Sequence, residues 1–117
     1  MSAAAGEQIG ITSERLAEWL AEDPSLQVID VREPYEREAG HIADTRHIEL
    51  MKLSEAAASI DSARAVVFYC RTGSRSMMAA QALRAAGYQA YSMDGGLVRW
   101  AAEQRPLQPQ DGYVANH

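Results

Sequence analysis

The chain contains very little cysteine, since Cys70 is the only one among its 117 residues. A single cysteine cannot form an internal disulfide, so no disulfide framework supports this fold. Chains without disulfides are typical of reducing compartments, and we therefore expect a cytoplasmic protein. The composition leaves open whether the lone thiol is core filler or a reactive group.

An excess of positive charge is also missing. The chain has 11 Lys and Arg against 16 Asp and Glu, a formal net charge of −5. Binding to nucleic-acid phosphates needs clustered basic residues in excess, so we expect no nucleic-acid partner. No apolar run approaches the roughly 20 residues of a membrane span, and we expect no membrane association.

The remaining composition is that of an ordinary globular protein. Hydrophobic residues make up 47% and charged residues 23% of the chain. This balance and length predict a compact soluble protein of a single domain, with one core and no need for a structural metal or disulfide.

Short apolar runs alternate with amphipathic segments along the chain. Strands are predicted at residues 26–31, 46–48, 65–69 and 89–93, and helices at residues 13–23, 34–39, 50–60, 76–86 and 97–104. The run at 65–69 is apolar throughout, as expected for a central strand covered on both faces. Gly40 is expected to end its helix in the left-handed conformation. The alternation predicts an α/β fold: a five-stranded, mostly parallel sheet with helices on both faces.

The polar hexapeptide CRTGSR, residues 70–75, lies between the most apolar strand and the helix that follows it. Ligands of parallel sheets collect at the carboxyl ends of strands, where helix N-termini offer unpaired N–H groups. Cys70 is the first residue of this turn. Gly73 gives it the conformational freedom to wrap successive backbone amides around an anion.

Four other side chains of the hexapeptide suit an anion. Thr72 and Ser74 carry hydroxyl groups, and Arg71 and Arg75 carry positive charge. Such polar and charged side chains are unsuited to a hydrophobic core but suited to binding an anion. A lone cysteine without such neighbours is more often an ordinary buried residue. The combination favours the thiolate of Cys70 and predicts a nucleophile with an anion-binding cradle.

The hexapeptide and the helix after it resemble the active loop of single-domain rhodaneses. Three further motifs in the same order strengthen the resemblance: VIDVRE at 28–33, GHI at 40–42, and DGG at 94–96 with Trp100. The resemblance covers residues 11–107, which leaves 1–10 as a lead-in and 108–117 as a tail, either disordered or draped over the domain. The family usually continues after GHI with Pro-Gly-Ala and an Asn, where this chain has ADTRH at 43–47.

The resemblance implies a sulfurtransferase that holds sulfane sulfur as a persulfide on Cys70. The donor would be a small anion such as thiosulfate, with 3-mercaptopyruvate, glutathione persulfide and protein persulfides as alternatives. The acceptor would be thiophilic: cyanide, a small thiol or a thioredoxin-like protein. The resemblance implies no metal and no organic cofactor.

Two other functions compete with this interpretation. A protein with the same fold could carry persulfide or bind a partner without turnover, but such a module would be expected to show a broken loop. Related phosphatases and arsenate reductases place five residues between the cysteine and the arginine, whereas four lie between Cys70 and Arg75. The shorter loop makes a tighter cradle, which suits one sulfur atom better than a phosphate.

Asp30 and Arg32 end a strand that is expected to neighbour the Cys70 strand. They could position the active loop, or they could form a structural ion pair or cap with Arg32 turned to solvent. His41 and His47 lack further ligands at metal spacing, and His41 is expected to hydrogen-bond its own loop.

Two predictions concern the remaining large or charged side chains. Trp19 and Trp100 recur at helical spacing with apolar residues and are expected to pack in the core. The acidic side chains of Glu33, Glu36 and Glu38 are expected to form a solvated face.

Overall fold

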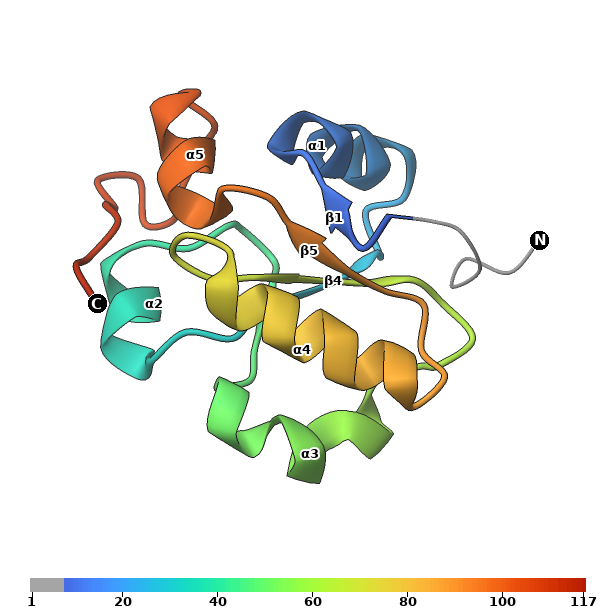
Figure 1. Ribbon diagram of the computed structural model, residues 1–117. Coiled ribbons are helices and arrows are strands. Elements are labelled where there is room, and N and C mark those ends of the chain that lie inside the picture. Colours follow the sequence, from blue (N-terminus) through green and yellow to red (C-terminus); the bar gives the residue numbers. More distant parts are fainter. Residues whose placement is uncertain (1–7) are drawn as a thin grey trace.

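The computed structural model describes residues 8–117, which contain a five-stranded sheet (Figure 1). The strands are β1 (Gly10–Ile11), β2 (Gln27–Asp30), β3 (Arg46–His47), β4 (Val66–Tyr69) and β5 (Ala90–Met93). Their order across the sheet is β1-β5-β4-β2-β3, and every neighbouring pair is parallel. The predicted α/β class is confirmed, and the sheet is parallel throughout.

Helices cover both faces of this sheet. They are α1 (Ser13–Glu22), α2 (Pro34–Ala39), α3 (Leu53–Ala56), α4 (Ser74–Ala85) and α5 (Gly96–Ala102). Figure 1 shows α1 and α5 on one side of the strands and α3 and α4 on the other. None of the helices within residues 8–117 is long and apolar enough to cross a membrane.

The central strand β4 contributes to two separate cores. Val66 and Phe68 pack in the cluster beneath α3 and α4, whereas Val67 and Tyr69 pack in the cluster beneath α1 and α5. All four side chains are fully buried. Burial on both faces explains why this stretch is apolar without alternation.

The segment predicted as one helix at residues 50–60 is instead broken into three short pieces. Two 3-10 turns, Leu50–Lys52 and Ala57–Ser59, flank α3. The Ser59 hydroxyl donates to the Ala56 carbonyl, the acceptor that a continuing α-helix would offer to the Ile60 amide. The Ile60 amide bonds to the Ala57 carbonyl instead, because the serine side chain competes with the backbone.

Gly40 also differs from its prediction. It follows α2 with φ 176° and ψ 137°, which is extended and not left-handed backbone. A Cβ atom at this position would lie 2.5 Å from the Tyr113 carbonyl oxygen. Glycine is required here because the C-terminal segment packs against its backbone, and not because a helix must be closed.

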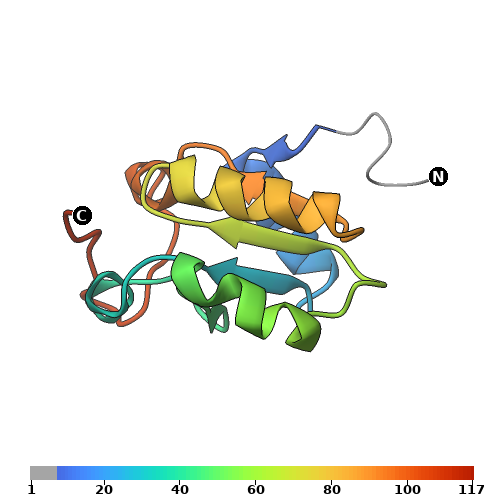
Figure 2. The ribbon, with the colours of Figure 1, turned by 60° about the horizontal axis from the view of Figure 1, so that its bottom comes forward.

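The C-terminal segment is draped over the domain. Gln108 forms an antiparallel bridge with His41, and the Tyr113 amide donates to the Ala39 carbonyl at 2.9 Å. Figure 2 shows this segment beside α2. The segment therefore borders the same end of the sheet at which the cysteine loop lies.

Two boundaries differ from their predicted positions. The fifth strand, β1, has only two residues, too few for a pattern to locate, and it begins within the predicted lead-in. Helix α4 begins at Ser74 and not at residue 76, so its first two residues belong to the hexapeptide.

Candidate active site

Cys70 directly follows the central strand β4 and is the first residue of the turn into α4. Side chains alternate along a strand, so Cys70 follows Val66 and Phe68 toward the core beneath α4. The chain then turns at Gly73, which caps α4 with a φ of 112°. Residues with a Cβ rarely adopt this conformation, so glycine is what allows the helix to begin inside the loop.

Hydrogen-bond donors surround the Cys70 sulfur, which is fully buried. The Gly73 amide donates to Sγ at 3.0 Å and the Ser76 amide at 3.4 Å. The Ser76 hydroxyl oxygen lies 3.5 Å from the same sulfur. Amides at a helix N-terminus carry partial positive charge, so this arrangement stabilises negative charge on the sulfur.

Ser76 lies one residue beyond the predicted cradle, and the sequence reasoning missed it. The available signal was its place in the first turn of the following helix, where backbone amides lack helical partners. A serine there can add both an amide and a hydroxyl to whatever the loop binds.

Backbone amides at the start of α5 donate hydrogen bonds to the cysteine loop. The Leu97 amide donates to the Cys70 carbonyl at 2.9 Å, and the Val98 amide donates to the Arg71 carbonyl at 3.0 Å. A Cβ at Gly96, which has a φ of 60°, would lie 2.4 Å from the Arg71 carbonyl oxygen. Gly96, the second glycine of the DGG motif, therefore permits the close approach between α5 and the backbone of the cysteine loop.

Arg75 is engaged in an ion pair and is not a free cation of the cradle. Its Nη1 and Nη2 atoms donate to the two carboxylate oxygens of Glu36 at 2.8 and 3.0 Å. Burial alone would raise the pKa of Glu36, but the bonds from Arg75 and from the Glu33 backbone lower it below its usual value. The same hydrogen bond to Glu36 raises the pKa of Arg75.

Glu36 is fully buried, so its assignment to a solvated face was wrong. It occupies the third position of α2, and its side chain also accepts from the Glu33 amide at 3.0 Å in a capping box. The spacing of Glu33 and Glu36 could have indicated the capping box. The partner from α4 could not be read from local sequence.

The other side chains of the hexapeptide lie at its outer side. Thr72 and Ser74 are exposed, and Arg71 is half-buried. Arg71 Nη2 donates to Asn116 Oδ1 of the C-terminal segment at 3.4 Å. The Nε atom of Arg71 is buried and has no hydrogen-bond partner among residues 8–117. Arg71 therefore retains an unused donor beside the cysteine, unlike Arg75.

Asp30 and Arg32 form a fully buried ion pair, so the alternative with Arg32 turned to solvent is wrong. Arg32 donates to Asp30 through Nε at 2.9 Å and Nη2 at 2.7 Å, and Nη2 also donates to the Gly40 carbonyl. The guanidinium lies 5.7 Å from the ring centre of Tyr69, which precedes Cys70. Through Gly40, the pair thus ties the C-terminal end of α2 to the end of β2.

The histidines serve the local backbone. His41 Nδ1 lies 3.1 Å from the Arg37 carbonyl, and His47 Nε2 lies 2.7 Å from the Arg32 carbonyl. The structural role expected of His41 is confirmed, but its side-chain partner lies in α2 and not in the loop that holds His41. Within residues 8–117, no three histidine, cysteine or acidic side chains cluster closely enough to hold a metal ion.

The segment at 43–47, where the chain departs from the family pattern, is tied to the central strand. The Thr45 hydroxyl donates to the Ile42 carbonyl at 2.7 Å and lies 3.0 Å from the Tyr69 hydroxyl. Burial raises the pKa of Tyr69 to about 12, so its hydroxyl remains protonated and available to this network.

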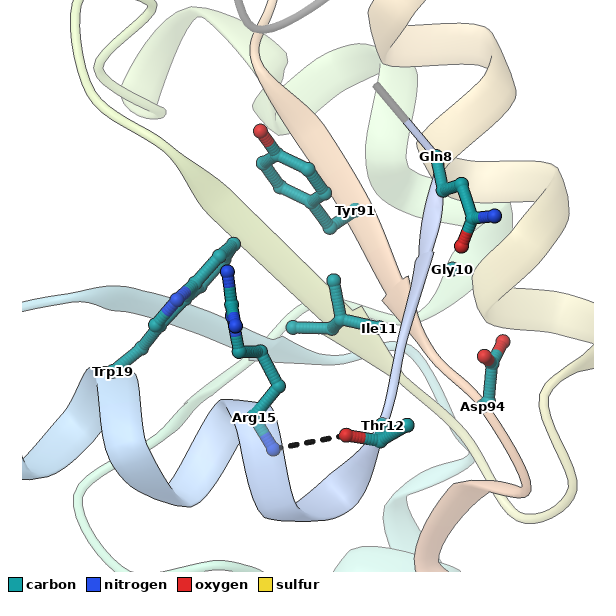
Figure 3. Close-up of a pocket in the computed structure, with 8 residues that line it drawn as sticks. All are labelled: Gln8, Gly10, Ile11, Thr12, Arg15, Trp19, Tyr91 and Asp94. Atoms are coloured by element: carbon teal, nitrogen blue, oxygen red, sulfur yellow. Dashed lines mark hydrogen bonds between the residues drawn. The ribbon is translucent and has the colours of Figure 1, made fainter.

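A separate hollow of about 390 Å³ lies beside β1 and is lined by none of the hexapeptide residues. Figure 3 shows Trp19, Arg15 and Tyr91 on the side of β1 that faces α1. The rings of Trp19 and Tyr91 meet edge to face, with centres 5.1 Å apart. Core packing is confirmed for Trp100, and Trp19 packs against the same core cluster while it stays half-buried at this hollow.

Comparison with known proteins identifies relatives of the whole domain. The family model of the rhodanese-like domain matches residues 12–103. The putative sulfurtransferase YtwF of Bacillus subtilis is 33% identical over 96 residues, which cover 82% of this chain and 93% of the relative. A sulfurtransferase of Allochromatium vinosum is 32% identical over 103 residues, which cover 87% and 96%.

A longer relative and a solved structure extend these matches. The probable adenylyltransferase/sulfurtransferase MoeZ of Mycobacterium tuberculosis is 37% identical over 99 residues, which cover 82% of this chain and only a quarter (25%) of MoeZ. The crystal structure of a rhodanese-related protein from Thermoplasma volcanium superposes with a TM-score of 0.79 at 28% identity, covering 86% of this chain and 97% of that one. On these matches and on the loop geometry, the chain belongs to the rhodanese-like family.

Proposed function

We propose that the chain is a sulfurtransferase that carries sulfane sulfur as a persulfide on Cys70. The observation that supports this most is the buried Cys70 sulfur, which accepts hydrogen bonds from the Gly73 and Ser76 amides. Preorganised donors of this kind stabilise charge that develops on a reacting atom. The family relationship to proteins named sulfurtransferases supports the same assignment.

The reaction has two steps. The Cys70 thiolate attacks the outer sulfur of thiosulfate, a sulfur–sulfur bond forms to Cys70, and the bond within thiosulfate breaks with its electron pair leaving on sulfite. A nucleophilic acceptor such as cyanide then attacks the terminal sulfur of the persulfide. Thiocyanate leaves and the Cys70 thiolate is restored, so no cofactor is required.

Arg71 is the side chain best suited to attract the anionic donor. Its buried Nε donor has no partner among residues 8–117, and a guanidinium binds a sulfonate-like group through charge-assisted hydrogen bonds. Arg75 contributes less to such attraction because Glu36 neutralises it at 2.8 Å. Thr72, Gly73 and Ser74 complete the proposed donor site at the exposed side of the loop.

The engagement of Arg75 also argues against the phosphatase alternative. A phosphatase of this loop type needs a guanidinium free to bind the phosphate oxygens, and here both carboxylate oxygens of Glu36 hold it. A persulfide carrier without turnover is the remaining alternative, and it shares the first step but not the second.

The test is to incubate the protein with thiosulfate and measure its intact mass. The expected result is an increase of one sulfur atom on the native chain and none on the Cys70→Ser variant. Addition of cyanide is then expected to release thiocyanate and restore the original mass. No adduct on the native chain would reject the mechanism, whereas an adduct that cyanide does not discharge would support the carrier.

A further inference from the structure

Two buried hydroxyl groups form a chain of contacts that leads to the Cys70 sulfur. Ser76, in the first turn of α4, has its Oγ 3.5 Å from Sγ. Ser92, on the neighbouring strand β5, has its Oγ 2.7 Å from the Ser76 Oγ. Ser76 is 0% exposed and Ser92 is 1% exposed, so water competes with neither hydroxyl.

The direction of the bond between the two serines follows from the available acceptors. Among the residues that the structure describes, the Ser92 side chain has one hydrogen-bond partner, the Ser76 Oγ. A buried hydroxyl that leaves its proton without an acceptor is costly. Ser92 therefore donates to Ser76, and the proton of Ser76 is left for another acceptor.

Ser76 has two acceptors within reach for that proton. Its Oγ lies 3.1 Å from the Gly73 carbonyl oxygen and 3.5 Å from the Cys70 sulfur. When Cys70 is a thiol, Sγ–H donates to Ser76, and Ser76 donates to Gly73. The Ser76 hydroxyl then accepts from Ser92 and from Cys70 and donates to Gly73, so its hydrogen-bonding capacity is fully used. When Cys70 is a thiolate, the sulfur has no proton to give and becomes the stronger acceptor.

We propose that the Ser76 hydroxyl turns from the Gly73 carbonyl to the Cys70 sulfur when the thiolate forms, and that Ser92 is the positioning residue that enables this turn. Ser92 donates to Ser76 in both states, and this donation polarises the Ser76 hydroxyl and strengthens the bond that it gives to the sulfur. The proposal rests on the function proposed above, because a stabilised thiolate is what that reaction consumes.

The charged groups around the sulfur are separate from this pair. They are Arg71 in the loop, Arg75 on α4 with its partner Glu36 on α2, and Asp30 at the end of β2. Serine substitutions leave all four charges in place. A change in thiolate formation can then be assigned to the hydroxyls.

The test follows alkylation of Cys70 by iodoacetamide as a function of pH, read by intact mass. Ser76→Ala is expected to raise the pH midpoint by about one unit, because the thiolate loses one hydrogen bond. Ser92→Ala is expected to raise it by about half as much, since a chain of hydrogen bonds is cooperative. The Ser13→Ala variant is a matched control, because Ser13 is also 1% exposed but bonds to Glu103.

The double variant Ser76→Ala/Ser92→Ala separates positioning from packing. If Ser92 acts through Ser76, the double variant has the same midpoint as Ser76→Ala alone. Additive shifts in the double variant, or no shift in either single variant, would overturn the proposal. Ser92→Thr keeps the hydroxyl and is expected to restore the native midpoint, and a midpoint equal to that of Ser92→Ala would also overturn it.

Alkylation requires no sulfur donor, so its result is independent of whether the chain transfers sulfur. If the protein takes no sulfur from thiosulfate but shows these midpoint shifts, the proposed function is contradicted and the proposed role of Ser76 and Ser92 is supported. If it forms persulfide without the shifts, the proposed function is supported and the role of the two serines is contradicted.

Discussion

The carboxylate of Glu36 and the guanidinium of Arg75 form a two-point ion pair that ties α2 to the first turn of α4. Glu36 is fully buried, and the Arg75 side chain is 17% exposed. The pair fixes the helix that follows the cysteine loop, and it also removes one positive charge from the site.

Glu36→Gln is expected to separate these two effects. The amide keeps the shape but leaves Arg75 without its counter-charge, so the free energy of unfolding should fall by about 2 kcal/mol in urea denaturation. The uncompensated guanidinium should also attract thiosulfate more strongly and lower its KM. Glu38→Gln is the matched control, because Glu38 is exposed on the same helix and should change neither quantity.

The same ion pair predicts acid sensitivity. The folded-state pKa of Glu36 lies below its ordinary value of 4.5, so below that pH the unfolded chain binds a proton that the folded chain does not. The contribution of Glu36 to stability is therefore complete above about pH 4.5 and is lost as the pH falls through the folded-state pKa. Between pH 6 and pH 3, urea midpoints should fall more steeply for the native chain than for Glu36→Gln. Equal slopes would contradict this account.

Arg71→Gln is expected to weaken donor binding without affecting the fold. The substitution removes the charge and the unpaired Nε donor beside the loop, so the KM for thiosulfate should rise about tenfold, the loss of one charged hydrogen bond. The urea midpoint should stay within error of the native value. Arg64→Gln, at an exposed arginine that bonds to Ser25, should leave the KM unchanged. A similar KM increase in both variants would assign the effect to net charge alone.

Gly96→Ala is expected to reduce sulfur transfer by displacing the loop. Its Cβ would lie 2.4 Å from the Arg71 carbonyl oxygen, and its φ of 60° is also unfavourable for alanine. Gly87→Ala is the control, since Gly87 has a φ of 95° but a Cβ added there would meet nothing within 4 Å. Both variants should lose about 1 kcal/mol from the positive φ, and Gly96→Ala should lose more because of its clash. Thiocyanate production should fall at least tenfold in Gly96→Ala alone.

Much of this structure could be predicted from local patterns, because those patterns have local causes. The apolar run that becomes β4 is needed because this strand is buried on both faces. The glycine that caps α4 is needed because the backbone there has a positive φ. The CRTGSR loop likewise follows from the strand before it and the helix after it. These features gave the position of Cys70 at the carboxyl end of the sheet.

The errors concern residues whose environment is set by distant parts of the chain. The spacing of Glu33 and Glu36 could indicate a capping box, but nothing in the local sequence distinguishes a buried Glu36 from a solvated one. Its partner Arg75 follows 39 residues later. Gly40 meets the backbone of Tyr113, and Ser76 meets Ser92 on another strand. Each of these contacts depends on the tertiary fold, which a pattern of spacing does not encode.

The contacts of α5 with the cysteine loop bear on how this chemistry could be transplanted. The carbonyls of Cys70 and Arg71 point to the amides of Leu97 and Val98, and in a planar trans peptide the N–H points opposite to the C=O. The N–H groups of these two peptide units are therefore directed away from α5. A hexapeptide grafted alone onto another strand–helix turn would lack this orientation. The smallest unit that a protein engineer should move is the loop together with Gly96 and the first turn of α5.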